Sequence, residues 1–478
     1  MDKIYNFEQY QGLNLDYSLI VNSTLDIKHG SILCINNEDA DKLDYLINQA
    51  LKKDVDKILT SSKSKISSEK VFRFGDYEKV FDDVLYNIYP SYKNKTYFGV
   101  TGTNGKTTTA YLLNSLLGDS SIFVGTIDDD NLFEFTNEKH LTTPKLFNLV
   151  KMLSLLDKNI TNVVLEVSSH ALTQKRLNGL HFKMSGFTNL SQDHLDYHNS
   201  MEEYFQAKTK LFNKNTSEEF AYIVSDYGEK LNALYDFRGI SIGNTNDNKV
   251  QLNSYSYNSI DFDIDGVNIN SKLHISGPEI IYNFLLAFSM AYYSKVKDIG
   301  ELKKQIPLLK NPNGRYEVIN YKNGEIIVDY SHTPEAIEKV IKYTKERYRK
   351  DVIVVFGAGG NRDKSKRKFM GEASQYADKI IITNDNPRKE DQLDISKQIL
   401  EGINLKKNVE VVLDRREAIS KGVNLLDGNS TLLVLGRGHE KFQEIGDKLF
   451  QFADIQVVKE VLGCLLYTSD AADESCSV

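Results

Sequence analysis

Apolar residues in the first third of the chain change from a strand pattern to a helix pattern around a glycine-rich loop. Residues 97–100 form a short apolar run before the loop, and apolar positions then recur at helical spacing at Ala110, Leu113, Leu116 and Leu117. This pattern predicts a strand, a tight turn and a helix. Residues 163–167 form a second, almost wholly apolar run, which is typical of a parallel strand covered on both faces.

The chain before this unit predicts a small α/β domain. Residues 1–93 combine short apolar pieces, such as residues 32–35, with a helix-like stretch over residues 41–51. The polar, tyrosine-rich segment 89–94 predicts a linker.

The pattern changes again in the second half of the chain. Residues 253–276 alternate polar and apolar positions, which predicts antiparallel strands, and residues 311–315 contain the proline and glycine of a hinge. Beyond the hinge, apolar runs separated by helical patterns lie at 326–328, 352–356, 380–382, 409–413 and 432–435. These runs predict a doubly wound sheet, in which ligands bind beyond the carboxyl ends of the strands.

Composition narrows the class of protein. The 478 residues are too many for one core, and a net charge of −7 disfavours general nucleic-acid binding. The three cysteines have no zinc or disulfide spacing, and no apolar run approaches the ~18 residues of a membrane span. We therefore expect a cytoplasmic protein without nucleic-acid or membrane partners. Residues 464–478 show no clear period and predict a non-native or disordered tail.

The glycine-rich loop reads GVTGTNGKTTT over residues 99–109. It resembles a phosphate-binding loop, but only Thr103 and Asn104 separate Gly102 from Gly105, whereas the common P-loop has four residues there. A related but distinct nucleotide site is indicated.

The loop and its companions resemble the Mur ligases, most closely the MurE type, which are ATP-dependent enzymes that extend the peptide of peptidoglycan precursors. The companion motifs are Thr142-Thr143-Pro144, Glu166-Val167-Ser168-Ser169-His170, residues 189–196 (NLSQDHLD), Ala207-Lys208, residues 329–334 (DYSHTP), Asp385-Asn386-Pro387-Arg388 and Gly438-His439-Glu440. They run in the family's order across roughly residues 96–460. The resemblance implies an α/β protein of three domains: an N-terminal uridine-binding domain (1–93), a central P-loop-type ATPase domain with a mostly parallel sheet (94–312) and a C-terminal Rossmann-like domain (313–463).

The resemblance also assigns roles at the ATP site. The implied ATP-binding residues are Gly102, Thr103, Asn104, Gly105, Lys106, Thr107, Thr108, Asn283, Asp329 and His332. The implied catalytic residues are Lys106, Glu166, His194, Lys208 and Arg315. Two Mg²⁺ ions are expected on Thr107, Glu166, His194 and Lys208, with Lys208 carbamylated by carbon dioxide. Spacing alone would leave Lys208 as a surface lysine on a helix, and Glu166 as a solvated carboxylate at a strand end.

Two further substrates are implied. Residues expected to hold the UDP-N-acetylmuramoyl dipeptide are Ser23, Thr142, Thr143, Ser168, Gln174, Arg176 and the modified Lys208. Those expected to hold the incoming diamino acid are Arg362, Asp385, Asn386, Arg388, Gly436 and Glu440. Arg388 favours meso-diaminopimelate, because a guanidinium can grip its second carboxylate through two hydrogen bonds. Lanthionine carries the same charges, and lysine stays open as an acceptor.

The expected reaction transfers the γ-phosphate of ATP to the substrate carboxylate, and the amino group of the acceptor then attacks the acyl phosphate. We expect a monomer that serves cell-wall biogenesis, and hence cell shape and division. Folylpolyglutamate synthetase is the nearest alternative enzyme, but it lacks the uridine domain and the DNPR text. A GTPase-like switch would need Asn-Lys-x-Asp, and the nearest text, residues 213–216 (NKNT), lacks the aspartate.

Overall fold

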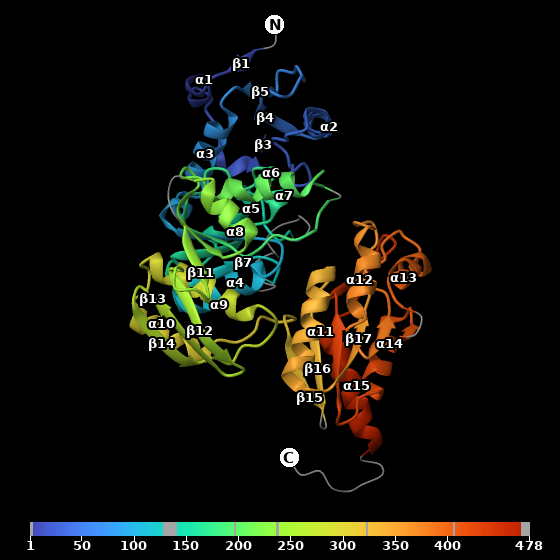
Figure 1. Ribbon diagram of the computed structural model, residues 1–478. Coiled ribbons are helices and arrows are strands. Elements are labelled where there is room, and N and C mark those ends of the chain that lie inside the picture. The colour runs from blue at the N-terminus through green and yellow to red at the C-terminus, as the bar shows by residue number, and fades with distance from the viewer. Residues whose placement is uncertain are drawn as a thin grey trace. The chain divides into compact units, whose positions relative to one another are not determined.

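The computed structural model describes residues 3–127, 141–195, 197–235, 239–321, 324–404 and 407–469 (Figure 1). Within them the chain forms two compact units, described separately here. The first comprises Met1–Thr101, Leu117–Ser185 and Ala207–Phe220, and the second comprises Gly102–Leu116, Gly186–Gln206 and Ala221–Val478.

The N-terminal part of the first unit is a parallel five-stranded sheet with the order β1-β5-β4-β3-β2. Its strands are β1 (Ile4–Tyr5), β2 (Ile20–Val21), β3 (Ser31–Cys34), β4 (Val55–Ser61) and β5 (Val71–Phe74). Its helices are α1 (Phe7–Gln11), η1 (Tyr17–Leu19), α2 (Ala40–Leu51), α3 (Tyr77–Ile88) and η2 (Pro90–Asn94). Helix α2 confirms the helix predicted over residues 41–51; Asp39 caps it, and Leu43 and Ile47 are buried against the sheet.

The segment predicted as a linker is ordered. Most of it is the 3₁₀ helix η2, in which Tyr92 is buried and donates a 2.7 Å hydrogen bond to Oδ1 of Asp82 in α3. Tyrosine therefore supplies packing at this position.

The central sheet has nine strands in the order β14-β13-β12-β11-β10-β9-β6-β8-β7. They are β6 (Thr96–Thr101), β7 (Ser121–Val124), β8 (Asn162–Glu166), β9 (Phe182–Phe187), β10 (Ser217–Ile223), β11 (Ile240–Gly243), β12 (Val250–Ser256), β13 (Ser259–Ile264) and β14 (Val267–Lys272). Strands β6, β8 and β7 pair in parallel, as do β10, β11 and β12. The last three strands pair antiparallel, which confirms the alternation seen in residues 253–276.

The helices of this region are α4 (Lys106–Leu117), α5 (Leu146–Ser154), α6 (Ser169–Thr173), α7 (Met201–Thr209), α8 (Asp226–Ala233), α9 (Ile280–Tyr293) and α10 (Ile299–Gln305). Short 3₁₀ helices are η3 (Gly118–Ser120), η5 (Lys210–Phe212) and η6 (Ile306–Leu308). Helix α9 is apolar on nearly every side and is largely buried.

The C-terminal part of the second unit is a six-stranded sheet with the order β15-β16-β20-β17-β18-β19. Its strands are β15 (Glu317–Tyr321), β16 (Gly324–Asp329), β17 (Asp351–Phe356), β18 (Lys379–Ile382), β19 (Asn408–Val411) and β20 (Ser430–Leu435), and all neighbours pair in parallel except β15 with β16. Its helices are α11 (Pro334–Tyr348), α12 (Lys366–Ser374), α13 (Gln392–Leu400), α14 (Arg415–Asn424) and α15 (Asp454–Ser469). A small hairpin of β21 (Phe442–Ile445) and β22 (Lys448–Gln451) precedes α15.

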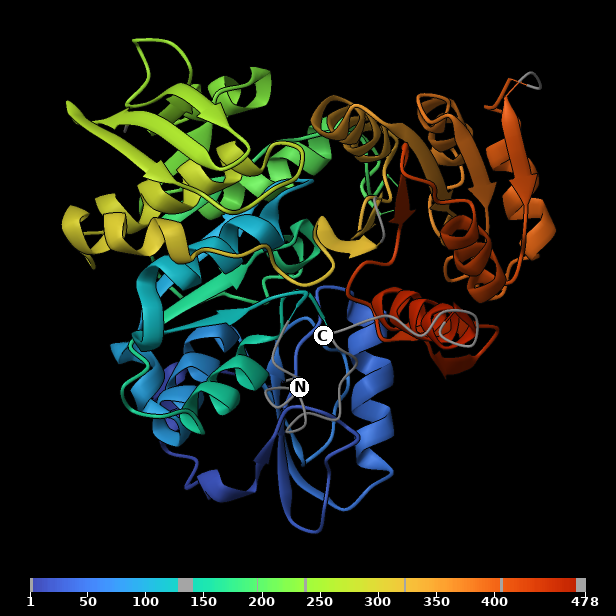
Figure 2. The same ribbon diagram turned by 90° about the horizontal axis from the view of Figure 1, so that it is seen from below.

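Separate cores cover the two faces of this sheet. Helices α11, α12 and α13 pack on one face, and α14 and α15 pack on the other (Figures 1 and 2). The doubly wound prediction is confirmed. Because β16, β20, β17 and β18 are parallel neighbours, the polar loops that follow them meet at one edge of the sheet.

The end of the chain corrects one expectation. Residues 464–469 continue helix α15 instead of lacking a helical period. The remainder of the predicted tail, 470–478, lies outside the described residues. Within the described ranges, no helix combines the length and hydropathy needed to cross a membrane.

Candidate active site

The glycine-rich loop between β6 and α4 is fixed by the segment that follows β9. The backbone N–H of Thr103 donates to the carbonyl of Asn189 at 2.9 Å, and the N–H of Asn104 donates to Oδ1 of the same residue at 2.9 Å. The Thr103 hydroxyl also bonds the Ser191 backbone. These amides hold the loop in shape, so a bound phosphate would depend on N–H groups at the start of α4.

Asn283 on α9 lies directly against this loop. A Cβ built on Gly105, whose φ is +82°, would lie 2.5 Å from Oδ1 of Asn283. The Thr109 hydroxyl donates to the same oxygen at 3.4 Å. Glycine is therefore required at position 105 by backbone conformation and by space.

Lys106, Thr107 and Arg315 surround the start of α4. Nζ of Lys106 donates to the carbonyl of Thr103 at 2.7 Å, and Nη2 of Arg315 donates to the Thr107 hydroxyl at 3.1 Å. The Arg315 guanidinium also lies 4.2 Å from the ring centre of Tyr330. The second unit thus brings Arg315 to two residues of the glycine-rich loop, Lys106 and Thr107, although the two segments were predicted separately.

Asp329 and His332 follow β16. Asp329 accepts hydrogen bonds from the backbone N–H of Tyr316 at 2.8 Å and of Ser331 at 2.7 Å. His332 is hydrogen-bonded to the Tyr330 carbonyl at 2.8 Å; burial, followed by the charge of Lys366, lowers the pKa of its imidazole. His332 is therefore neutral near pH 7.

His194 has a left-handed backbone conformation, with φ +56°. Its ring lies edge-on to Tyr204, and its neighbour Asp193 is paired with Lys366 at 3.5 Å. Burial alone would raise the pKa of Asp193, but the charge of Lys366, followed by that of His194, holds it well below its usual range. Asp193 is therefore ionised. Asp196, the last residue of this motif, lies outside the described residues.

In the first unit, Glu166 lies at the end of β8 and its Oε2 accepts two hydrogen bonds from Thr126, from the N–H at 3.0 Å and the hydroxyl at 2.8 Å. The Thr126 hydroxyl is also 3.3 Å from the Thr142 hydroxyl. Glu166 is 2% exposed, so it is a hydrogen-bonded buried carboxylate and not a solvated strand end.

The predicted dipeptide-binding residues cluster beside Glu166. The Thr143 hydroxyl donates to the Glu166 carbonyl at 2.8 Å and accepts from the N–H of Ser168 at 3.0 Å. Arg176 donates to the Thr143 carbonyl at 2.8 Å and to Oε1 of Gln174 at 2.9 and 2.7 Å. Ser23 instead accepts a local hydrogen bond from the N–H of Leu25 in the N-terminal sheet region.

Lys208 is buried on α7, with 1% of its surface exposed, which overturns the surface position that its spacing suggested. Burial disfavours a charged ammonium and lowers a lysine pKa in general. The described residues hold no cluster of three His, Cys, Asp or Glu side chains suited to a metal. The predicted metal ligands, which include Thr107 and Lys208, are of mixed type and belong to both units.

The predicted diamino-acid residues converge around Gly359 in the second unit. A Cβ built on Gly359 would lie 3.2 Å from Nη1 of Arg388, 3.7 Å from Cγ of Arg362 and 3.9 Å from Oδ1 of Asp385. Gly436 adjoins the same site, because its Cβ would lie 2.7 Å from Oδ2 of Asp385.

Asn386 and Glu440 complete this cluster. Nδ2 of Asn386 donates to Oε2 of Glu440 at 2.7 Å. Burial, followed by the charge of Asp385, raises the pKa of Glu440 to about 7. Nε of Arg437 also pairs with Oε2 of Glu440, at 3.4 Å. Arginine side chains and two acidic groups therefore share one small region.

Several contacting residues were missed by the sequence analysis. Thr126 holds Glu166, Asn189 holds the glycine-rich loop, and Oε2 of Glu444 in β21 accepts a hydrogen bond from Nε of Arg388 at 2.9 Å. Asn189 was within a quoted motif, yet Thr126 and Glu444 carry no signal besides their residue type.

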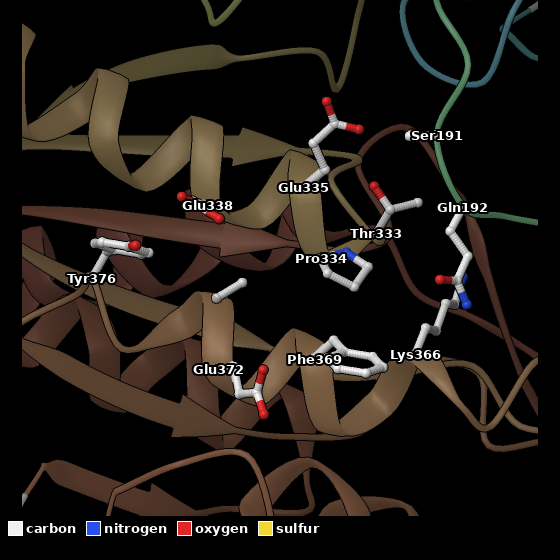
Figure 3. Close-up of a pocket in the computed structure, with 11 residues that line it drawn as sticks. Ser191, Gln192, Thr333, Pro334, Glu335, Glu338, Lys366, Phe369, Glu372 and Tyr376 are labelled. Atoms are coloured by element: carbon white, nitrogen blue, oxygen red, sulfur yellow. The ribbon is translucent and has the colours of Figure 1, made fainter.

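A pocket of about 500 Å³ lies between α11, α12 and residues 191–192 (Figure 3). Its lining includes the carboxylates of Glu335, Glu338 and Glu372 beside the rings of Phe369 and Tyr376. Lys366 also lines the pocket, and Glu335 and Glu338 pair with Lys339 and Lys342, so its charged groups are of both signs.

The chain is similar to known proteins over most of its length. Residues 100–291 match the Mur ligase middle domain, and residues 314–438 match the Mur ligase glutamate ligase domain. The chain is 38% identical over 378 residues to the UDP-N-acetylmuramoyl-L-alanyl-D-glutamate--2,6-diaminopimelate ligase of Aquifex aeolicus, covering 76% of this chain and 77% of the relative. The ligase of the same name from Clostridioides difficile is 33% identical over 469 residues, or 94% and 96% of the two chains.

Solved structures show the same fold. A structure titled as a UDP-N-acetylmuramoyl-L-alanyl-D-glutamate 2,6-diaminopimelate ligase superposes with a TM-score of 0.64 at 24% identity, covering 97% of this chain and 100% of that one. The MurF ligase of Thermotoga maritima in complex with ADP gives 0.61 at 17% identity, covering 95% and 100%. With both domain models matched and such relatives aligned over most of its length, the chain belongs to the Mur ligase family and is of the MurE type.

Proposed function

We propose that this protein is an ATP-dependent ligase that joins diaminopimelate to UDP-N-acetylmuramoyl-L-alanyl-D-glutamate in peptidoglycan biosynthesis. Relatives named for this activity support the reaction. The observation that carries the choice of acceptor is the convergence of Arg362, Arg388 and Asp385 around Gly359.

The charges of this cluster match those of a diamino diacid. Arg362 and Arg388 would each bind a carboxylate, while Asp385 and Glu440 would hold the distal ammonium group. Lysine has one carboxylate fewer and would leave Arg388 without a ligand. Lanthionine has the same charged groups, so it stays an alternative acceptor.

The cluster beside Glu166 would bind the muramoyl dipeptide through Thr142, Thr143, Ser168, Gln174 and Arg176, with Ser23 contributing in the proposed N-terminal domain. Their hydroxyl, amide and guanidinium groups suit carboxylates and phosphates. The proposed domain limits are 1–93, 94–312 and 313–463.

ATP would bind at the start of α4, where Lys106 and Arg315 offset charge on the transferred phosphoryl group. Gly102, Gly105 and Thr108 shape the loop, and Asn283, Asp329 and His332 are the proposed nucleoside contacts. The substrate carboxylate attacks the γ-phosphorus, ADP leaves, and the acceptor amine then attacks the acyl carbon. Phosphate leaves as the amide forms, and the amine loses a proton.

Mg²⁺ fits this proposal, because Thr126 holds the Glu166 carboxylate in place through two hydrogen bonds to Oε2 and magnesium prefers oxygen ligands. Glu166, Thr107, His194 and a carbamylated Lys208 would hold two ions. When bound, the ions would neutralise charge on the phosphates. The buried amine of Lys208 suits carbamylation, since the reaction needs the uncharged form. We further propose a cytoplasmic monomer that acts in cell-wall biogenesis.

The test is phosphate release from ATP with the muramoyl dipeptide and a panel of meso-diaminopimelate, lanthionine and lysine. The proposal expects release that depends on both the dipeptide and the acceptor, with diaminopimelate preferred over lysine. Arg388→Ala is expected to remove most of that preference. A preference for lysine in the wild-type enzyme, or ATP hydrolysis without either substrate, would contradict the assignment.

A further inference from the structure

The hairpin β21–β22 is hydrogen-bonded to the loop that carries Arg388. Backbone hydrogen bonds join the Arg388 N–H to the Glu444 carbonyl at 3.1 Å and the Gly446 N–H to the Arg388 carbonyl at 2.7 Å. The N–H of Glu444 also donates to Oδ1 of Asn386 at 2.8 Å, and Nε2 of Gln443 donates to the Asp385 carbonyl at 2.6 Å. Both backbone groups of Arg388 are thus fixed by the hairpin.

These hydrogen bonds maintain an unusual backbone conformation at Arg388. Arg388 has a φ of +52°, in the left-handed region that residues with a side chain seldom adopt. Such a conformation persists where the surroundings hold it. Here those surroundings are residues 444–446, which therefore decide the direction in which the Arg388 side chain leaves the loop.

The hairpin also holds the guanidinium itself. Nε donates to Oε2 of Glu444 at 2.9 Å, and Nη1 donates to the Gly360 carbonyl at 2.7 Å. Across the part of the chain that the structure describes, Nη2 of Arg388 makes no hydrogen bond, and the side chain is 22% exposed. Glu444 therefore occupies Nε and the Gly360 carbonyl occupies Nη1, which leaves Nη2 for a ligand.

We infer that Glu444 is a positioning residue that aims Arg388 at the second carboxylate of the acceptor and so sets the preference for a diacid over lysine. The inference rests on the proposed function. Glu444 acts through Arg388 and has no contact with the reacting atoms in this scheme. Its carboxylate accepts a hydrogen bond from Nε and so does not compete with the acceptor carboxylate for Nη2.

Removal of the Glu444 side chain would have two opposite effects on the affinity of Arg388 for the acceptor carboxylate. The guanidinium would lose its anchor at Nε and sample other directions, which weakens binding by the cost of ordering it again, about 3- to 10-fold. Loss of a nearby negative charge would strengthen attraction for a carboxylate, but the pair is 22% and 35% exposed and solvent screens that gain. We expect the loss of orientation to dominate.

The test compares the wild-type enzyme with Glu444→Ala, Glu444→Gln and the control Glu460→Ala. Glutamine keeps an oxygen that accepts from Nε, whereas alanine does not. Glu460 forms an ion pair with Arg416 at 2.6 Å between α14 and α15, where the two side chains are more exposed than those of Arg388 and Glu444. Its substitution therefore shows the effect of losing an arginine–glutamate pair away from the proposed acceptor site. KM values for diaminopimelate, lysine, ATP and the muramoyl dipeptide are measured for each, with thermal melting to verify folding.

The expected result for Glu444→Ala is a KM for diaminopimelate raised about 3- to 10-fold, with KM for ATP and for lysine unchanged and the diacid preference reduced accordingly. Glu444→Gln should stay within about twofold of the wild type, and Glu460→Ala should equal it. An unchanged or lowered KM for diaminopimelate in Glu444→Ala overturns the inference, as does an equal rise for every substrate. A wild-type enzyme that does not use diaminopimelate as an acceptor overturns the proposed function, and with it the inference.

Discussion

Arg415 and Asp454 form an ion pair in which both side chains are fully buried, with Nε to Oδ1 at 2.7 Å and Nη2 to Oδ2 at 2.6 Å. Arg415 also donates to the carbonyls of Asn384 and Leu435, at 3.2 and 2.9 Å. These carbonyls lie just before Asp385 and Gly436. The buried ion pair therefore holds two loops of the proposed acceptor site through hydrogen bonds to their backbone.

Removal of one partner should be costly, because the other charge would stay buried without a counterion. We expect Asp454→Ala to destabilise this sheet by about 3–5 kcal/mol, seen as faster hydrogen exchange in β18 and β20. The exposed pair of Arg416 and Glu460 is the control, and Glu460→Ala should cost less than about 1 kcal/mol. Equal effects of the two substitutions would contradict this account. An apolar double substitution, Arg415→Met with Asp454→Leu, should recover part of the loss.

Features that depend on residues close together along the chain were predictable from the sequence. The apolar runs at 352–356 and 432–435 became β17 and β20, because continuous burial on both faces of a parallel strand leaves a clear apolar signature. The loop at 102–107 and the DNPR text were likewise visible, since glycine, proline and charge stand out locally.

Contacts between distant residues were not predictable. Glu444 lies 56 positions from Arg388 and Thr126 lies 40 positions from Glu166, and neither spacing leaves a period in one sequence. The burial of Lys208 was missed for a related reason: a lysine on a helix is usually exposed, and only packing of other segments around α7 covers it. Residue type gave the candidate chemistry, while tertiary packing decided which groups meet.

Glu440 should make acceptor binding depend on pH. Its pKa of about 7 means that the carboxyl group is increasingly protonated below pH 7, and the neutral form attracts an ammonium group poorly. KM for diaminopimelate is therefore expected to rise as the pH falls through about 7, whereas KM for ATP should not follow it. Glu440→Gln should raise KM at high pH and flatten this dependence. The same KM profile in the variant would show that another group is responsible.

The same group should affect stability in the opposite direction. Its folded pKa exceeds the value of about 4.3 expected in the unfolded chain, so its contribution is fully present below about pH 4.3 and is lost as the pH rises through about 7. Without substrate, the difference in melting temperature between wild type and Glu440→Gln should therefore shift in favour of the variant from pH 6 to pH 8. Saturating diaminopimelate should reduce that shift, because its ammonium group compensates the charge.

Gly105 should tolerate no side chain. In Gly105→Ala, the φ of +82° costs about 1–3 kcal/mol and the Cβ would meet Oδ1 of Asn283. Gly266→Ala is the matched control, because its φ is +76° but nothing lies within 4 Å of the added Cβ. Both variants should lose stability, but only Gly105→Ala should raise KM for ATP, by about tenfold or more. Equal KM values for ATP in both variants would show that the loop does not bind the nucleotide.

Lys208 offers a test of its chemical state that does not depend on turnover. A lysine that is 1% exposed is a candidate for modification, because burial disfavours the charged form of an amine. We expect ¹³C-labelled bicarbonate to give a carbamate carbonyl signal in the wild-type protein that is absent in Lys208→Arg. Because arginine stays protonated, the variant cannot form the carbamate, and its phosphate release should fall at least 100-fold without recovery in added bicarbonate. The exposed Lys230 provides the control, and Lys230→Arg should retain both the signal and the activity. A signal that persists in Lys208→Arg would mean that the carbamate forms on another amine. A fully active variant would mean that the buried amine acts as a plain cation.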